Sequence, residues 1–122
     1  MPVDELVPTQ SVVDGRIEWR LPNGELHRRG GPAIFVPEDG TQYWYDHGEL
    51  HRENGPAIVV PGRYEAWYQH GQRHRINGPA IERWDGPNEW WVGGKLRRAP
   101  SRLGLWLPPW LGGWPKVKHP RR

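Results

Sequence analysis

The chain has 122 residues, a length that fits one domain, and it contains 16 Gly, 14 Pro and 9 Trp but no Cys. A sequence without cysteine excludes disulfides, thiolate nucleophiles and Cys-ligated zinc or iron–sulfur sites. Only 35% of the residues are hydrophobic, too few for a deep two-layer core. No apolar run approaches the ~20 residues that a membrane span needs.

The net charge of +3 conceals an uneven distribution along the chain. Residues 95–122 hold 8 of the 17 Lys and Arg and none of the 14 Asp and Glu, so this segment carries +8 and residues 1–94 carry −5. A cationic end on an acidic body indicates either contact with an anionic partner or folding of the end back onto the body. The sequence leaves both interpretations open.

A hexapeptide pattern recurs along residues 14–98. Its copies are NGELHR at 23–28, HGELHR at 47–52, HGQRHR at 70–75 and GGKLRR at 93–98. The glycines at the second position of these copies are 24, 23 and 23 residues apart. The sequence Gly-Pro-Ala-Ile follows the first three copies. A tryptophan precedes each copy, at Trp19, Trp44, Trp67 and Trp90.

Each of these units has the pattern of two short strands joined at the turn dipeptide. Asn-Gly, His-Gly and Gly-Gly favour a two-residue type I′ turn, because both central residues of that turn take positive φ. Glycine or proline interrupts every candidate helix. We therefore predict an all-β fold of roughly eight short antiparallel strands. In the first unit Trp19 lies five residues before Gly24, against four in the others, so we expect a longer loop there.

The turn positions predict an aromatic face. With His47-Gly48 at the corners of the turn, Trp44 faces His51 across the hairpin. The predicted face consists of Trp44, Trp67 and Trp90 with His51 and His74. Its rings either pack within the fold as Trp–His pairs or stack on sugars or bases. Each Gly-Pro is predicted to form a bulge that redirects the chain, because Gly permits backbone conformations that other residues avoid.

The third unit contains the pattern Tyr64-x-x-Trp67-x-x-x-Gly71-x-x-His74, followed by Asp85-Gly86. This pattern resembles the MORN repeat family, in a variant where His-Arg-x-x-Gly-Pro-Ala replaces His-Gly-x-Gly. The resemblance covers residues 14–98 and implies consecutive antiparallel hairpins in one elongated, twisted sheet. It also implies a scaffold or interaction role, and only loosely the binding of acidic phospholipids. Similar variants occur in proteins of bacteriophages and giant viruses, which implies a viral accessory or structural protein in the host cytoplasm or the virion.

The chain is predicted to divide into a lead-in at 1–13, the repeat sheet at 14–98 and a non-regular tail at 99–122. The tail is rich in Trp, Pro and cations, and its Pro-Pro and Gly-Gly pairs disfavour a helix. Three interpretations stay open: packing on the sheet as a second layer, insertion into a groove of a protein partner, or binding at an anionic membrane surface. The candidate binding residues are Trp106, Trp110, Trp114, Lys116, Lys118, Arg121 and Arg122.

The sequence indicates no catalytic, metal or cofactor site. Equivalent histidines of adjacent hairpins would lie roughly 10 Å apart, too far to share a zinc ion with ligands at about 2 Å. Ser11 and Ser101 stand in no nucleophile motif, and no P-loop or metalloprotease motif occurs. We therefore predict a non-enzymatic interaction or structural protein that binds another protein or its own copies. A membrane-surface or carbohydrate-binding module is the alternative, and nucleic acid would bind only weakly, through the basic tail.

Overall fold

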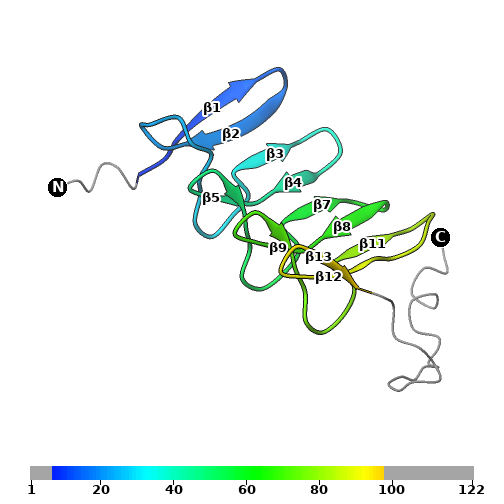
Figure 1. The fold of residues 1–122 in the computed structure, drawn as a ribbon. Helices are drawn as coiled ribbons and strands as arrows, with labels where there is room; N and C mark the ends of the chain where they lie inside the picture. Colours follow the sequence, from blue (N-terminus) through cyan, green and yellow to red (C-terminus); the bar gives the residue numbers. More distant parts are fainter. Residues whose placement is uncertain (1–6, 98–122) are drawn as a thin grey trace, which may run out of the picture.

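The computed structural model describes residues 7–97, which form strands, turns and loops without a helix (Figure 1). One antiparallel sheet of 7 strands, the main sheet, has the order β1-β2-β3-β4-β7-β8-β11. Its strands are β1 Thr9–Val13, β2 Arg16–Arg20, β3 Ile34–Val36, β4 Thr41–Tyr43, β7 Ile58–Val60, β8 Tyr64–Ala66 and β11 Ile81–Arg83.

Three two-stranded hairpins, the hairpin row, accompany the main sheet (Figure 1). The row consists of β5 Tyr45–Asp46 with β6 Glu49–Leu50, β9 Tyr68–Gln69 with β10 Gln72–Arg73, and β12 Trp90–Val92 with β13 Lys95–Arg97. The chain passes alternately between the main sheet and the hairpin row. The prediction of an all-β fold made of consecutive antiparallel hairpins is therefore confirmed.

The strands of residues 7–97 are shorter and more numerous than predicted, because the chain bends at Trp44 and at Trp67, whereas Trp19 lies within β2 and Trp90 begins β12. β4 ends at Tyr43 and β5 begins at Tyr45, so Trp44 belongs to neither strand. The Trp44 N–H donates to the carbonyl of Ala57 at 2.7 Å, and the Trp44 carbonyl accepts the N–H of His51 at 3.0 Å. Trp44 thus bonds to the main sheet on one side and closes its own hairpin on the other.

The hairpin turns have the predicted chemistry except at Asn23-Gly24. Both central residues have positive φ, as a type I′ turn requires, in His47-Gly48, His70-Gly71 and Gly93-Gly94, and also in Asp14-Gly15, whereas only the glycine of Asn23-Gly24 does. The first unit has the longer loop that the sequence predicted: the Leu21 N–H donates to the Glu25 carbonyl at 2.8 Å, and Asn23 Oδ1 accepts the Glu25 N–H at 2.9 Å.

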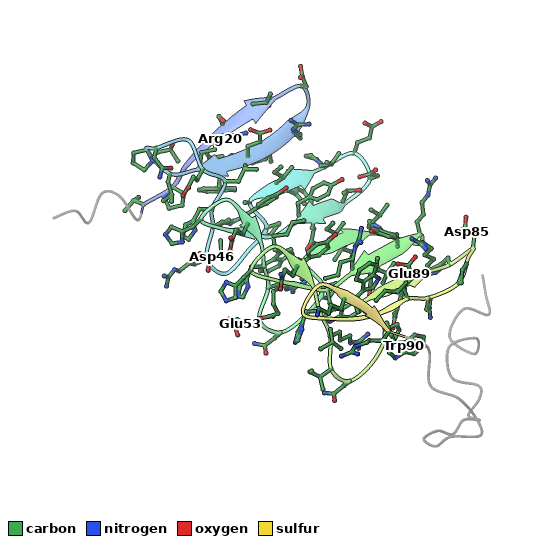
Figure 2. All side chains as sticks on the ribbon, viewed as in Figure 1. Arg20, Asp46, Glu53, Asp85, Glu89 and Trp90 are labelled. Atoms are coloured by element: carbon green, nitrogen blue, oxygen red, sulfur yellow. The ribbon has the colours of Figure 1, made fainter. Side chains whose placement is uncertain are left out.

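The core is a narrow seam of small side chains. Ala33, Ala57, Ala66 and Ala80 are completely buried, and Ile81 is 1% exposed. The N–H of Ala57 donates to the carbonyl of Ala66 and its carbonyl accepts from Trp44, so this alanine lies at a junction between units. Side chains project around the sheet, with Asp46 on the hairpin row and Asp85 at the tip of the last main-sheet loop (Figure 2). A seam of alanines needs few large apolar residues, in agreement with the low hydrophobic fraction.

The two edges of the main sheet differ. β1 is the outermost strand on one side and β11 on the other. Ile81 in β11 exchanges two backbone hydrogen bonds with Glu89, at 3.1 and 2.9 Å, so the segment before β12 covers part of that edge. Within residues 7–97, no strand pairs with the outer side of β1.

No helix in the described part of the chain is long and apolar enough to cross a membrane. The predicted tail residues lie outside the described residues; they are Trp106, Trp110, Trp114, Lys116, Lys118, Arg121 and Arg122.

Candidate functional site

The recurring histidines connect each unit to the next through one ring nitrogen. In every case Nδ1 accepts the backbone N–H of the first turn residue in the following unit. These bonds join His47 N–H to His27, His70 N–H to His51, and Gly93 N–H to His74, at 2.9, 2.9 and 2.8 Å. His27 and His51 are buried, with exposed fractions of 2% and 8%. Loss of either ring would leave a backbone donor without its partner at this junction.

The turn glycines reinforce the same junction. Each donates its N–H to the carbonyl of the residue before the histidine in the preceding unit. The pairs are Gly48 with Leu26, Gly71 with Leu50 and Gly94 with Arg73, at 2.8, 2.8 and 3.0 Å. Two successive N–H groups of each turn therefore bind the preceding unit, one through a side chain and one through the backbone.

The arginine after each histidine stacks on the tryptophan of its own unit. The Cζ-to-ring-centroid distances are 4.3 Å for Arg28 over Trp19, 3.6 Å for Arg52 over Trp44 and 3.8 Å for Arg75 over Trp67. Nη1 of each also donates to a proline carbonyl four residues later, at 3.3 Å to Pro32, 3.0 Å to Pro56 and 3.1 Å to Pro79. The cation–π contact and this hydrogen bond together hold each His-Arg loop over its tryptophan.

The glycine of each Gly-Pro-Ala sequence leaves space for this guanidinium. A Cβ at Gly31, Gly55 or Gly78 would lie 2.8, 3.0 or 2.9 Å from Cζ of the arginine three residues earlier. None of these glycines has a left-handed φ, so the predicted reason for glycine, an unusual backbone conformation, is wrong here. Gly55-Pro56 and Gly78-Pro79 lie in loops between the hairpin row and the main sheet, and Gly31-Pro32 lies in the loop between β2 and β3, rather than in bulges. The close approach of arginine is what favours glycine at these positions.

The arginines also change the predicted aromatic face. The backbone register is as predicted, because His51 and His74 donate their N–H groups to the carbonyls of Trp44 and Trp67, both at 3.0 Å. The ring partner of each tryptophan, however, is arginine rather than the histidine opposite, since the histidine ring bonds to the next unit. One face of the Trp44 and Trp67 rings is therefore covered. Trp90 is half-buried and pairs with Arg97 in the predicted register.

His27, Asp46 and His47 form a cluster that the sequence did not predict. One potential ligand atom of each lies within 4.8 Å of the others, and Asp46 Oδ1 is 3.4 Å from His27 Nδ1 and 2.5 Å from His47 Nδ1. The Nδ1 lone pair of His27 already accepts the His47 N–H, so a metal ion would compete with the junction bond. In the next unit Gln69 replaces Asp46, yet His51 makes the same bond. The histidine contact therefore does not depend on the carboxylate.

The environment of the cluster favours a neutral His27. Burial lowers the pKa of this imidazole from its usual 6.5, His47 adds to the effect, and the Asp46 carboxylate opposes it. A neutral ring is what the junction requires, because Nδ1 accepts a hydrogen bond only when it carries no proton. Burial tends to raise the pKa of Asp46, but the hydrogen bond from His47 and the nearby histidines bring it below its usual 3.8.

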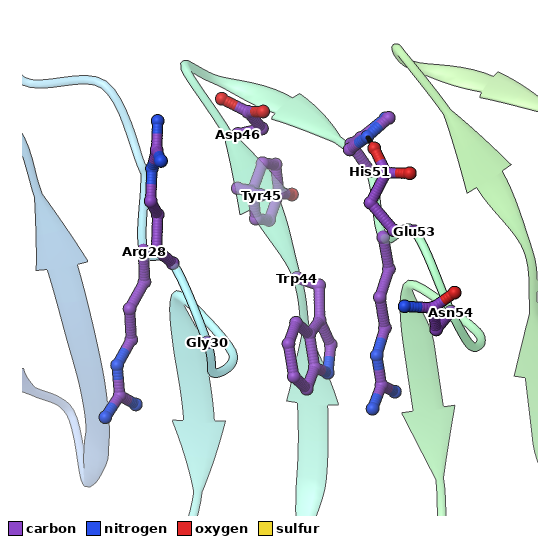
Figure 3. Close-up of a pocket in the computed structure, with 10 residues that line it drawn as sticks. Arg28, Gly30, Trp44, Tyr45, Asp46, His51, Glu53 and Asn54 are labelled. Atoms are coloured by element: carbon purple, nitrogen blue, oxygen red, sulfur yellow. Dashed lines mark hydrogen bonds and ion pairs between the residues drawn. The ribbon is translucent and has the colours of Figure 1, made fainter.

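A groove of about 480 Å³ separates the first two His-Arg loops (Figure 3). In this view Trp44 and Tyr45 lie between Arg28 and the loop that carries His51 and Glu53. Its charged lining is mixed, with Arg28, Arg29 and Arg52 against Asp46 and Glu53. Glu53 is paired with His51 at 3.0 Å. The groove therefore shows no preference for an anionic or a cationic ligand.

Comparison of the chain with protein-family models, curated proteins and solved structures finds no match. The resemblance to the MORN family, and the viral setting that it implies, stay predictions. Sequence reasoning missed the unit-to-unit histidine contacts and the Arg–Trp stacks. A usable signal existed, because arginine and the later glycine recur together, three residues apart, in each of the first three units.

Proposed function

We propose that the chain is a non-enzymatic interaction protein whose all-β body holds the tryptophan-rich, cationic tail for binding to a protein partner. The observation that supports this proposal most strongly is that the recurring polar and aromatic residues of the body contact one another. His51 Nδ1 bonds to the next unit, and Arg52 covers Trp44. The most distinctive side chains of the described body thus serve its own assembly, and we assign partner binding to the tail.

Charge and residue type support the same proposal. Residues 95–122 carry +8 against −5 for residues 1–94, and three of the nine tryptophans lie between residues 106 and 114. Tryptophan and arginine are the residue types most enriched among binding hot spots of protein interfaces. A cationic, aromatic segment fits an acidic groove with apolar pockets on a partner protein. From the resemblance to viral variants, we propose that such an assembly forms in the virion or the host cytoplasm.

The test compares the full chain with two variants, a deletion of residues 103–122 and the triple substitution W106A/W110A/W114A. Quantitative cross-linking mass spectrometry in the cells of origin measures which proteins contact the chain. We expect the same specific contacts to be lost in both variants while the circular dichroism spectrum and unfolding midpoint of the body are unchanged. Contacts with other proteins that persist in both variants would contradict the proposal, whereas contacts between copies of the chain do not bear on it.

The membrane alternative has its own control. If the tail binds anionic lipid, tryptophan emission shifts to the blue with vesicles of phosphatidylserine and phosphatidylcholine, and salt reduces the shift. Substitution of Lys116, Lys118, Arg121 and Arg122 by alanine should then abolish it. We expect no such shift. A salt-sensitive shift that depends on these four residues would replace the protein-partner proposal with the membrane one.

A further inference from the structure

We infer that β1 is a pairing edge, through which two copies of this chain join their main sheets into one continuous antiparallel sheet. β1 is outermost in the main sheet, and Thr9, Gln10, Ser11 and Val12 are exposed, Val12 to 70%. The opposite edge is partly covered by the bonds between Ile81 and Glu89. β1 and β2 have five residues each, whereas the other main-sheet strands have three.

The composition of β1 supports pairing. Its sequence, TQSVV, contains no charge, no proline and no glycine. Proteins usually protect an exposed edge with lysine, proline, a bulge or a very short strand, because an open row of N–H and C=O groups recruits other strands. β1 uses none of these devices over its five residues. Asp14 follows β1 in the turn, and the charges on β2 are paired with one another, since Glu18 binds Arg16 at 2.8 Å and Arg20 at 3.1 Å.

The hydrogen bonds of β2 show which β1 groups point outward. Trp19 donates its N–H to the Ala33 carbonyl and accepts the His27 N–H, so its backbone groups point away from β1. Gln10 lies opposite Trp19, and Val12 lies opposite Ile17. Residues opposite each other in an antiparallel pair alternate between bonded and non-bonded positions. The backbone N–H and C=O of Gln10 and Val12 therefore point away from the sheet.

One register with two-fold symmetry pairs all of these outward-pointing N–H and C=O groups with a second copy of β1. If Ser11 lies opposite Ser11 of the second copy, Gln10 lies opposite Val12 in both directions. Each of these two hydrogen-bonded pairs exchanges two backbone bonds. Pro8, which has no N–H, then lies opposite the turn residue Asp14, outside the paired segment. The ladder thus begins and ends with β1 itself, and the partner that fits this edge is a second β1.

This inference goes beyond the proposed function, because it concerns β1 and not the tail. The two are tested with different variants. A failed tail experiment therefore does not affect the β1 inference, and a failed β1 experiment does not affect the proposed function of the tail. The natural absence of cysteine gives a direct test, since a single introduced thiol can form only an intermolecular disulfide.

The experiment is a cysteine scan of the full chain with the variants Gln10→Cys, Ser11→Cys and Val12→Cys. Under mild oxidation, Ser11→Cys should form a covalent dimer, because facing residues of a non-bonded pair lie within the Cα distance of a disulfide, about 4.5 Å. Gln10→Cys and Val12→Cys are matched controls that face a different residue of the second copy and should stay monomeric on reducing-agent-free gels. Faster cross-linking at position 10 or 12, or equal cross-linking at all three, would overturn the inference.

A second measurement needs no cross-link. Sedimentation equilibrium should give twice the chain mass for the wild type and the mass of one chain for Val12→Pro, because the hydrogen bond that proline removes is an outward one and the β1–β2 ladder keeps all its bonds. Val12→Thr keeps the N–H and the β-branched shape and should remain dimeric. A wild-type mass of one chain throughout the accessible concentration range would overturn the inference.

Discussion

The main sheet and the hairpin row are built from the same units but are joined by different kinds of contact. Strands of the main sheet pair through backbone ladders, as between β7 and β8, and a ladder requires no particular side chain. Equivalent strands accordingly vary, from IFV in β3 to IVV in β7 and IER in β11. Successive hairpins are joined instead through His51 and its equivalents, with arginine stacked on tryptophan at each loop. The recurring His-Arg pair therefore belongs to the contacts that depend on side chains, while in the main sheet the recurrence is limited to the buried alanine and the isoleucine that opens β3, β7 and β11.

Removal of one junction histidine should have the largest effect on stability. His51→Ala should lower the free energy of unfolding by about 2–3 kcal/mol, because it leaves the His70 N–H without its acceptor and opens a cavity at a buried position. Denaturant unfolding of the full chain measures this change. The matched control is His70→Asn, which keeps a residue that tolerates positive φ at an exposed position and should change stability by about 0.5 kcal/mol or less. Similar losses in both variants would contradict the assignment of the junction to His51.

The space beneath the stacked guanidinium provides a second test. Gly55→Ala should destabilise the fold by about 1–2 kcal/mol, because the added Cβ would lie 3.0 Å from Cζ of Arg52 and displace it from Trp44. A double-mutant cycle sharpens the result. In an Arg52→Ala background, Gly55→Ala should cost little, since the clash no longer exists. Additive losses would show that glycine is needed at this position for another reason.

The pH dependence of stability separates the junction from the ladders. The pKa of His27 is lowered in the folded state from 6.5, so the unfolded chain binds more protons at mildly acidic pH. The stability contributed by neutral His27 is complete above about pH 6.5 and declines as the pH falls toward the folded-state pKa. Thermal unfolding between pH 8 and pH 5 should show this decline, and it should be smaller in His27→Asn. A decline of unchanged size in that variant would assign it to other groups.

Two carboxylates also stabilise the fold less as the pH falls, but at lower pH than His27. The hydrogen bond from Arg16, together with Arg20, lowers the pKa of Glu18 from 4.5 despite its burial, and the pKa of Asp46 is lowered from 3.8. Their contributions are present above these usual values and are lost as the pH falls below them. The histidine effect therefore appears first on acidification and the carboxylate effects follow.

The smallest effect is expected in the main sheet. Val59 in β7 lies between Gln42 and Glu65 in the ladder and is half-buried. Val59→Thr keeps the β-branched shape and every backbone hydrogen bond, so the free energy of unfolding should change by about 0.5–1 kcal/mol. Denaturant unfolding measures it beside His51→Ala. A loss of stability as large as that of His51→Ala would remove the distinction between the main sheet and the hairpin row.

Local chemistry explains why much of the fold could be predicted from residues alone. Turn dipeptides such as His47-Gly48 need positive φ at both positions, and a two-residue turn then determines which residues face each other. The scarcity of large apolar residues likewise anticipated a shallow core, which the structure forms from alanines. These features depend on residues that are neighbours in the chain or that face each other across one turn.

Contacts between units could not be read in the same way, because they depend on how far each unit is displaced from the one before it. That displacement brings His27 of one unit against Asp46 and His47 of the next, and likewise His51 against His70. Because the His51 ring bonds to the next unit, Arg52 of the same unit covers the Trp44 ring instead. The strand interruptions at Trp44 and Trp67 divide the chain between the main sheet and the hairpin row. The periodicity of the sequence predicts that equivalent units pack against each other. Which side-chain atoms come into contact is determined only by the tertiary packing of those units.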